Sequence, residues 1–277
     1  MSKPSLIVEF TKMQAAGNDF IIVDNRFYYF SAQEQSYLAK KWCDRHFGIG
    51  ADGLVVLGVA ANDTNHVTMR HYNPDGKEAT LCGNGTRCAA LYALNVGMAE
   101  ASDVQLLTGA GLLTAHVQRF DHAEDRVTVK MPTPTDWRVA EIETQARSIS
   151  VAQVWTGTEH AVYEQKEGID FLQYAPMVRS HESMGEKGVN VNQLEVIEPG
   201  RARIRTFEKG VEEETLACGT GAVAAAVYLA RLHGSQPDVL LHANGGDLRA
   251  YKRADNWYLE GPAAAVYRGT FEYNGQV

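Results

Sequence analysis

Cysteine is scarce in this chain, and its distribution excludes several common uses of the residue. Four cysteines in 277 residues are too few for a disulfide framework. Cys82 and Cys88 match no zinc motif, because no pair of histidines stands at ligand spacing beside them. The chain also has no Cys-x-x-Cys pair, which argues against a thiol–disulfide oxidoreductase. We therefore expect reduced thiols, no bound metal and a cytoplasmic protein.

Excess positive charge and long apolar runs are lacking as well. The formal net charge is −8 and the pI is near 5.6, which argues against nucleic acid or an anionic membrane as a partner. No apolar run reaches the length of a membrane span, and residues 1–10 lack the core of a signal peptide. Hydrophobic residues make up 45% of the chain and charged residues 22%, as in ordinary folded proteins. The length suits two domains of about 130 residues.

A short loop, Cys-Gly-polar-Gly, occurs twice and precedes an Ala-rich segment each time. The copies begin at Cys82 and Cys218, which are 218 − 82 = 136 residues apart. A thiol at the start of a helix lies near free backbone N–H groups and the positive end of the helix dipole, which lower its pKa. The glycines let the backbone approach a bound carboxylate closely. The repeat predicts an internally duplicated protein with one such cysteine in each half.

Two cysteines of this kind fit the inversion of a carbon stereocentre. One thiolate removes the proton from one face, and one thiol returns a proton to the other. Backbone N–H groups that hold the carboxylate of the substrate would stabilise the charge that develops at the α-carbon. The structural alternative is that Cys82 and Cys218 are small buried residues beside tight turns.

Further motifs accompany the two loops over nearly the whole chain. They are Gly17-Asn18-Asp19-Phe20, Gly48-Ile49-Gly50-Ala51-Asp52, Tyr72-Asn73-Pro74-Asp75-Gly76, His181, Val189-Asn190-Val191, residues 208–221 and Gly261-Pro262-Ala263. With these motifs the chain resembles the diaminopimelate epimerase family of cofactor-independent amino-acid epimerases. The resemblance implies interconversion of LL- and meso-2,6-diaminopimelate in lysine and peptidoglycan precursor biosynthesis. It implies a small amino-acid substrate and no cofactor.

The predicted elements favour an α+β fold over a doubly wound parallel sheet, because strands outnumber helices. We expect helices at residues 32–44, capped by Ser31, and after Cys82 to residue 95 and after Cys218. Expected strands cover residues 6–13, 19–25, 53–59, 66–72, 104–108, 111–117, 126–130, 148–155, 161–164, 202–207, 239–243, 246–253, 256–260 and 266–273. Residues 131–135 carry two prolines and read as a linker.

The family resemblance sharpens this picture. It implies two similar domains, each a curved or barrel-like sheet around a central helix, with the active site in the interdomain cleft. The N-terminal domain would comprise residues 1–130 with 264–277 returning to it, and the C-terminal domain residues 131–263. A homodimer is also implied, with Tyr267 at the subunit interface, although an aromatic residue packed under the final strand explains the same position.

Individual site residues follow from the resemblance. Cys82 and Cys218 match the acid/base cysteines, and His160 and Glu208 match groups that tune the pKa values of these cysteines. The positions that match substrate-binding residues are Asn18, Asn73, Gly83, Asn84, Asn190, Glu208, Lys209, Gly219 and Thr220. For Asn18 and Asn73 a role in a turn is an alternative, and Asn190 also fits an interior strand position.

The chain departs from the common family pattern near the end of the substrate that does not react. Thr158 and Glu159 replace an Asn-Pro pair, and Lys209 replaces an arginine that can bind a carboxylate with two parallel hydrogen bonds. Residues 211–215 form a longer segment without its usual glycine, and Gly53 stands where a glutamine is sometimes found. A racemase of the same fold with an altered distal pocket, acting for example on histidine, is therefore an alternative. A catalytically silent binding protein is a third reading, which retention of both cysteine loops disfavours.

Overall fold

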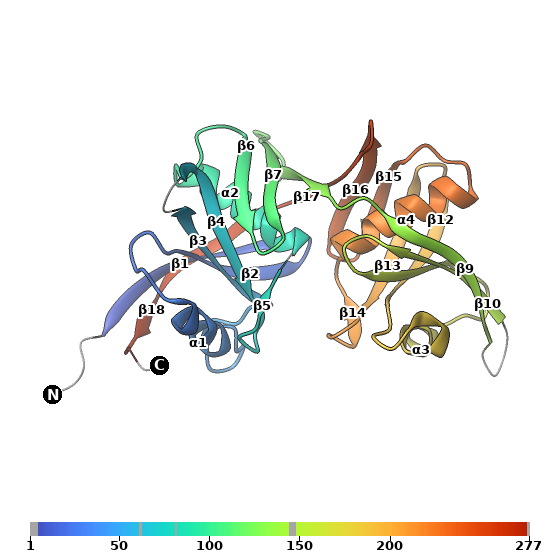
Figure 1. Cartoon of the computed structure of the whole chain (residues 1–277), viewed down its shortest axis with the longest axis horizontal. Coiled ribbons are helices and arrows are strands. Elements are labelled where there is room, and N and C mark those ends of the chain that lie inside the picture. The colour runs from blue at the N-terminus through green and yellow to red at the C-terminus, as the bar shows by residue number, and fades with distance from the viewer. Residues whose placement is uncertain (1–4, 61–62, 81, 144–147, 276–277) are drawn as a thin grey trace. The chain divides into compact units, whose positions relative to one another are not determined.

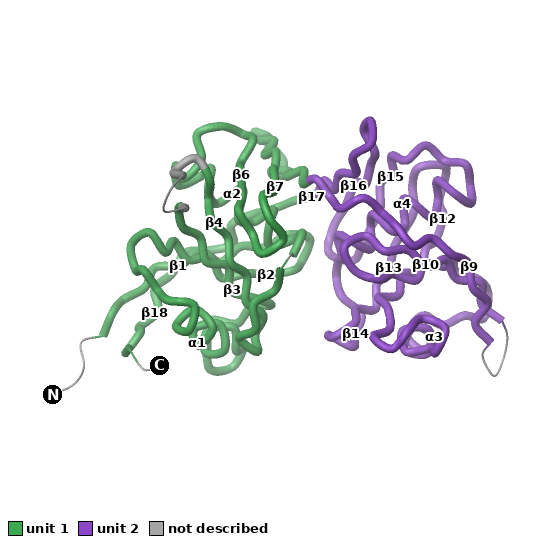
Figure 2. Tube along the Cα trace, in the orientation of Figure 1, with its two compact units in different colours: residues 1–129, 262–277 green, residues 130–261 purple. Residues whose placement is uncertain are grey.

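The structure is a computed structural model that describes residues 5–60, 63–80, 82–143 and 148–275. The chain forms two compact units, shown in green and purple in Figure 2. Unit 1 comprises Met1–Val129 and Pro262–Val277, and unit 2 comprises Lys130–Gly261. The boundaries expected from the sequence, after residues 130 and 263, lie one and two residues beyond these divisions.

Unit 1 is built on one mixed sheet whose strands pair in the order β18-β1-β2-β3-β4-β6-β7-β8. The pairs β2–β3 and β4–β6 are parallel, and the other neighbours in this order are antiparallel. The short strand β5 lies along β4. The strands are β1 (Leu6–Ala15), β2 (Asn18–Asp24), β3 (Gly53–Ala60), β4 (Asp63–Tyr72), β5 (Glu78–Ala79), β6 (Asp103–Thr108), β7 (Gly111–Gln118), β8 (Arg126–Met131) and β18 (Ala264–Tyr273).

Unit 2 repeats this pairing pattern strand for strand. Its order is β9-β10-β11-β12-β13-β15-β16-β17, the pairs β11–β12 and β13–β15 are parallel, and the short strand β14 lies along β13. The predicted internal duplication is therefore confirmed by the topology. The strands are β9 (Thr135–Glu143), β10 (Ser148–Trp155), β11 (Glu159–Glu164), β12 (Asn190–Glu198), β13 (Arg201–Glu208), β14 (Glu213–Thr215), β15 (Asp238–Ala243), β16 (Gly246–Arg253) and β17 (Asn256–Pro262).

One long helix in each unit lies against several strands of its own sheet. Helix α2 (Gly83–Asn95) contacts β1, β2, β3, β4, β6, β7 and β18, and helix α4 (Gly219–Leu232) contacts β10, β11, β12, β13, β15 and β16 (Figure 1). Contact with strands across most of the width of the sheet means that each sheet curves around its helix. Small alanine side chains allow this close approach, and most residues of both helices are buried. The expected α+β fold with a curved sheet around a central helix is confirmed.

A second helix in each unit makes the other parallel crossover. Helix α1 (Ala32–Trp42) joins β2 to β3 and begins at Ser31, whose hydroxyl accepts from the N–H of Glu34 while the Glu34 carboxylate accepts from the N–H of Ser31. Helix α3 (Phe171–Arg179) joins β11 to β12 and is followed by a short 3-10 helix, η1 (Glu182–Met184). Leu38, Ala39 and Trp42 of α1 belong to an apolar cluster separate from the one around α2.

Six of the described elements were not anticipated from the sequence: the short elements β5, β14 and η1, and the longer elements α3, β9 and β12. Helix α3 contains Pro176, strand β9 starts at the end of the segment predicted to be a linker, and strand β12 begins with buried polar residues. The linker expected over residues 131–135 is therefore shorter, because Met131 ends β8 and Thr135 starts β9. Within the part of the chain that the structure describes, no helix has the length and apolar character needed to cross a membrane.

Candidate active site

Cys82 is the residue from which α2 begins. Its backbone is extended (φ −139°, ψ 108°), and its carbonyl accepts the first helical hydrogen bond from the N–H of Thr86 at 2.8 Å. The N–H of Gly85 points back to Cys82 Sγ at 3.4 Å, so the sulfur itself caps the helix. Such a backbone donor stabilises a thiolate more than a thiol. Leu81, which precedes Cys82 in the motif, lies outside the described residues.

Behind this loop, Asn84 and Arg87 fix one another inside unit 1. The guanidinium of Arg87 is fully buried and donates to Asn84 Oδ1 at 2.7 Å and to the carbonyl of Pro262 at 3.3 Å. Asn84 in turn donates through Nδ2 to Asn18 Oδ1 at 3.2 Å. Burial lowers the pKa of Arg87 to about 10, and the neighbouring Cys82 and Cys88 act in the opposite direction. The positive charge at the base of this loop was not predicted from the sequence.

Asn18 also makes a hydrogen bond to a cluster of charged side chains. Its Nδ2 donates to Asp52 at 2.6 Å, and Asp52 shares the guanidinium of Arg45 with Asp19. Lys12 completes the cluster through an ion pair of 2.8 Å with Asp19. Burial of Asp19 opposes its ionisation, but hydrogen bonds from Arg45 and Lys12 outweigh burial and hold its pKa below the usual range. The loop that carries Asn18 is thus fixed by ionic contacts, and Asn18 is itself fixed to Asn84.

The second loop begins at Cys218, from which α4 starts with nearly the same backbone conformation (φ −124°, ψ 114°). Its sulfur is supported differently. Cys218 Sγ lies 3.4 Å from Thr220 Oγ1, and Thr220 Oγ1 lies 2.9 Å from His160 Nε2. The carbonyl of Thr220 also accepts from the hydroxyl of Thr156 at 2.8 Å. Matching sequence loops therefore share their backbone but not their side-chain partners.

His160 is fully buried on β11 and is enclosed by amide groups of the parallel neighbour β12. Asn190 Nδ2 lies 3.5 Å from His160 Nε2, and Asn192 Nδ2 lies 3.0 Å from His160 Nδ1. Burial lowers the pKa of His160 to about 3, and the nearby Lys209 ammonium acts in the same direction. The ring is therefore neutral at physiological pH. Asn192 was missed from the sequence, although its position two residues after Asn190 places both on the same face of a strand.

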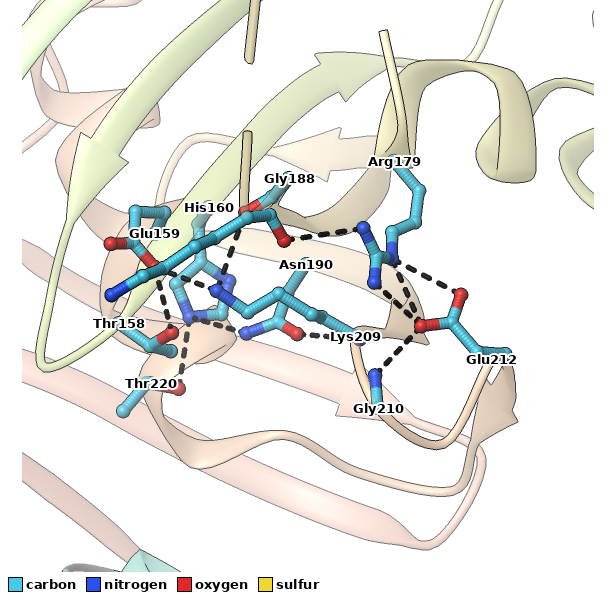
Figure 3. A network of polar contacts seen from close by, with 11 residues as sticks. Thr158, Glu159, His160, Arg179, Gly188, Asn190, Lys209, Gly210, Glu212 and Thr220 are labelled. Atoms are coloured by element: carbon cyan, nitrogen blue, oxygen red, sulfur yellow. Dashed lines mark hydrogen bonds and ion pairs between the residues drawn. The ribbon is translucent and has the colours of Figure 1, made fainter. Parts of the chain in front are cut away.

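Lys209 is held in the polar network of Figure 3. Its ammonium donates to Glu159 Oε2 at 2.7 Å and to the carbonyl of Gly188 at 3.3 Å, and its backbone N–H donates to Asn190 Oδ1 at 2.8 Å. The hydrogen bond from Lys209 lowers the pKa of Glu159. Thr158 also donates to this carboxylate at 3.3 Å. Lys209 and Glu159, two of the positions that depart from the common family pattern, thus form an ion pair with each other.

The turn after Lys209 is held by a second ion pair. Arg179 contacts Glu212 at 2.6 Å, and Glu212 also accepts from the N–H of Gly210 at 2.9 Å (Figure 3). Arg179 passes so close to Gly188 that a Cβ there would lie 2.2 Å from Arg179 Nη1. The glycine whose carbonyl binds Lys209 is therefore required by packing as well.

The remaining predicted residues lie as follows. Asn73 is exposed in the turn after β4, where its carbonyl accepts from the N–H of Gly76 at 2.8 Å. Glu208 is partly buried at the end of β13, next to Lys209. Tyr267 lies on β18 with 46% of its surface exposed, and its ring packs edge-on against Phe10 at 5.9 Å.

The other two cysteines are unlike the pair in the loops. Burial raises the pKa of the Cys43 thiol to about 12, and burial also raises that of Cys88 far above its ordinary value. Neither is suited to act as a thiolate near neutral pH. Among the described residues, no group of three or more His, Cys, Asp or Glu side chains is arranged to hold a metal ion.

Solved structures with this architecture identify the structural class. A phenazine biosynthesis protein of the PhzF family from Bacillus anthracis matches with a TM-score of 0.75 and 16% identity, covering 96% of this chain and 99% of that one. A hydroxyproline epimerase from Agrobacterium vitis with bound trans-4-hydroxy-L-proline matches with a TM-score of 0.71 and 17% identity, covering 97% and 93%. The chain has the duplicated α+β fold of this class.

Sequence relatives identify the family within the class. The diaminopimelate epimerase family model matches residues 10–137 and 153–266. A diaminopimelate epimerase of Hydrogenobaculum sp. (strain Y04AAS1) is 35% identical over 95% of this chain and 98% of its own, and that of Chlorobaculum tepidum is 38% identical over 93% and 99%. The chain belongs to the diaminopimelate epimerase family. Epimerases are isomerases, so the chain is an enzyme of that class.

Proposed function

We propose that this enzyme interconverts LL- and meso-2,6-diaminopimelate by two-base proton transfer at the α-carbon, with Cys82 and Cys218 as the two bases. In each direction, the thiolate of one cysteine removes the α-proton and the thiol of the other returns a proton to the opposite face. The roles are exchanged in the reverse direction, so the protein ends each turnover with one thiolate and one thiol. Family membership supports diaminopimelate as the substrate.

One observation supports this proposal above the others. The two cysteines of the duplicated loops each begin a long buried helix with nearly the same extended backbone. Backbone N–H groups in the first turn of a helix point toward its start, so those of Gly83–Asn84 and Gly219–Thr220 are positioned to bind a carboxylate. Holding the reacting carboxylate there would stabilise the negative charge that spreads from the α-carbon after the proton is lost. The chemistry as proposed uses no cofactor and no metal.

The other candidate residues divide into two groups. Asn18 is bonded to Asn84 of the first loop, and His160 contacts Thr220 of the second, so these two support the reacting end. Asn190, Glu208 and Lys209 are grouped at the end of β13 and its neighbour β12, and we assign them to the distal amine and carboxylate. Asn73 is proposed as a further substrate contact.

The test is exchange of the α-hydrogen in deuterated water. Wild-type protein should incorporate deuterium at the α-carbon of diaminopimelate, and Cys82→Ala and Cys218→Ala should each lower inversion by about 10²–10⁴-fold or more. Cys43→Ala is the matched control, because it removes a buried thiol with a raised pKa. Full activity of either single loop variant, or a requirement for pyridoxal phosphate or metal, would refute the mechanism.

One contact favours an alternative substrate in place of diaminopimelate. The ammonium of Lys209 is neutralised by Glu159, so a carboxylate at the distal end would have to compete with that ion pair. The alternative is therefore a racemase of the same fold whose substrate, such as histidine, has no distal carboxylate. Parallel exchange assays with diaminopimelate, histidine, lysine and glutamate decide between them. If an amino acid without the distal carboxylate exchanges its α-hydrogen faster than diaminopimelate does, that amino acid is the better assignment for the substrate.

We further propose a cytoplasmic homodimer. The edge strand β18 and its neighbour β1 expose Ile7, Val266 and Tyr267, whose exposed fractions are 63%, 58% and 46%. Exposed apolar side chains on one ribbon are typical of an interface. The mass in solution at micromolar concentration tests the dimer, and Tyr267→Asp should weaken it. A monomeric wild-type protein would refute it.

A further inference from the structure

The hydrogen-bonding groups around Asn192 determine which way its amide is oriented. Asn192 is fully buried, and its Nδ2 lies 3.3 Å from the carbonyl of Ala161, which can only accept a hydrogen bond. Its Oδ1 lies 2.9 Å from the hydroxyl of Thr206, which can donate. Rotating the amide by 180° would place two carbonyl oxygens against each other at Ala161. The nitrogen of Asn192 is therefore the atom that faces His160.

The orientation of this amide determines where the proton of the imidazole resides. Asn192 Nδ2 donates to His160 Nδ1 at 3.0 Å, so Nδ1 must be the bare nitrogen. The ring is buried and neutral, and its single proton is consequently on Nε2. The Nε2 proton is donated to Thr220 Oγ1 at 2.9 Å. Asn190 Nδ2 is a donor that also faces Nε2, but its contact of 3.5 Å is at the limit of hydrogen-bond distance and is weaker than the 3.0 Å contact of Asn192 with Nδ1.

The direction of the next hydrogen bond follows from the first two. The hydroxyl of Thr220 accepts from His160, so its own proton is free to be donated. Cys218 Sγ lies 3.4 Å from this hydroxyl. We infer that Asn192 is a positioning residue that holds His160 as the Nε2–H tautomer, so that Thr220 donates its hydroxyl proton to the sulfur of Cys218. The opposite tautomer would draw the Thr220 proton to the imidazole and away from the sulfur.

Packing keeps the relay in this one arrangement. Gly221 passes directly beneath the amide, and a Cβ at that position would lie 2.4 Å from Asn192 Oδ1. The charged groups that act on the imidazole are Lys209 and Glu159, which are paired with each other at 2.7 Å. A donor–acceptor chain of four side chains thus connects the interior of β12 to the start of α4. Because a hydrogen bond to a thiolate favours the charged form, the relay favours Cys218 as a thiolate acceptor.

The inference rests on the proposed role of Cys218, but its first test does not require turnover. In protein with ¹⁵N-labelled histidine, the NMR signals of the His160 ring should show the proton on Nε2 in the wild type. Asn192→Asp replaces the donor with an acceptor of the same size, and should move the proton to Nδ1 at mildly alkaline pH. Asn190→Asp is the matched control, because it makes the same change on the Nε2 side and should leave the proton on Nε2. A proton on Nδ1 in the wild type would overturn the inference, whether or not the variants fold.

The second test measures the sulfur. In a Cys82→Ala background, ultraviolet absorbance of the thiolate reports Cys218, since the raised pKa values of Cys43 and Cys88 leave those thiols protonated. Asn192→Asp should raise the apparent pKa of Cys218 by about one to two units, the value of one hydrogen bond to a charged group. An unchanged titration would contradict the relay. Failure of the proposed function is a separate outcome, seen as absence of deuterium exchange in wild-type protein with a normal tautomer.

Discussion

The duplicated loops provide a pair of matched glycines at which the same substitution should have opposite effects on stability. Gly85 and Gly221 are the third residues after Cys82 and Cys218, and both lie in the first turn of a helix. In α2, a Cβ at Gly85 would meet its nearest neighbour, a ring carbon of Phe20, at 3.5 Å. This is an ordinary van der Waals contact. At Gly221, the same Cβ would lie 2.4 Å from an oxygen of the Asn192 amide.

The size of the difference follows from these contacts. Alanine is favoured over glycine in a helix by about 0.5–1 kcal/mol, so Gly85→Ala should stabilise the protein by up to this amount. Gly221→Ala gains the same propensity but displaces Asn192, which bonds to His160 and Thr206. Overpacking costs about 1–3 kcal/mol, and each buried hydrogen bond that is broken adds about 1 kcal/mol. We therefore expect a net loss of about 2–4 kcal/mol.

Urea unfolding of the two variants and the wild type measures this difference. If the two units unfold in separate transitions, Gly221→Ala should lower the midpoint of unit 2 and Gly85→Ala should raise that of unit 1 slightly. The tautomer of His160 should also be disturbed only by Gly221→Ala. Equal midpoints for the two variants, or a Gly221→Ala protein as stable as the wild type, would refute the packing argument.

Three further predictions concern buried or paired charges. Arg87→Met should destabilise unit 1 by about 2–4 kcal/mol in urea unfolding, because it leaves buried acceptors such as Asn84 Oδ1 without their donor; an unchanged midpoint would contradict this. The pKa of His160 is lowered from 6.5 to about 3, so its contribution to stability is complete above pH 6.5 and is lost as the pH falls toward 3. His160→Asn should flatten that part of the stability–pH curve, and an unaltered slope would show that the histidine is accessible to protons. Lys209→Ala should lower kcat/KM for diaminopimelate by about ten- to a hundredfold, whereas Lys209→Arg should retain it. Glu159→Gln should lower KM, because it releases the Lys209 ammonium to bind the substrate. If Lys209→Ala has no effect on kcat/KM, the Lys209–Glu159 ion pair has only a structural role.

The sequence predicted best those elements whose signals are local. The helix after Cys82 ends at Asn95 as expected, because a glycine loop, a run of alanines and a positive φ at Gly97 all lie within sixteen residues of one another. Helix α3 was missed because Pro176 interrupts a short segment that is stabilised by burial of its apolar face. Strand β9 was missed because most of its side chains are exposed, which leaves no alternating apolar pattern to recognise.

The same distinction between local and long-range signals applies to the candidate site. The cysteines, His160 and Lys209 stood in recognisable motifs, but their partners depend on which strands lie side by side. His160 faces Asn190 only because β11 and β12 pair in parallel, with these two residues in register. Such pairing brings together residues 30 positions apart and leaves no local signal. The partnership of Lys209 with Glu159 across 50 positions was hidden for the same reason.

The differences between the two loops are as informative as their likeness. The proposed mechanism needs a thiolate base and a thiol acid in the same molecule. Two thiols in identical surroundings would share one intrinsic pKa. Apart from the coupling between them, the form with one thiolate and one thiol would then be common only near that pH. Duplication provides the common feature, a cysteine at the start of a buried helix. The side chains behind it have diverged, since the position five residues after the cysteine is the buried cation Arg87 in one loop and the buried apolar Val223 in the other. A positive charge lies beneath Cys82, whereas Cys218 is reached by a neutral hydroxyl and imidazole. Unequal support for the two sulfurs would help the proposed mechanism by keeping one a thiolate and the other a thiol, and substitutions that make the two loops alike should narrow the pH range of activity.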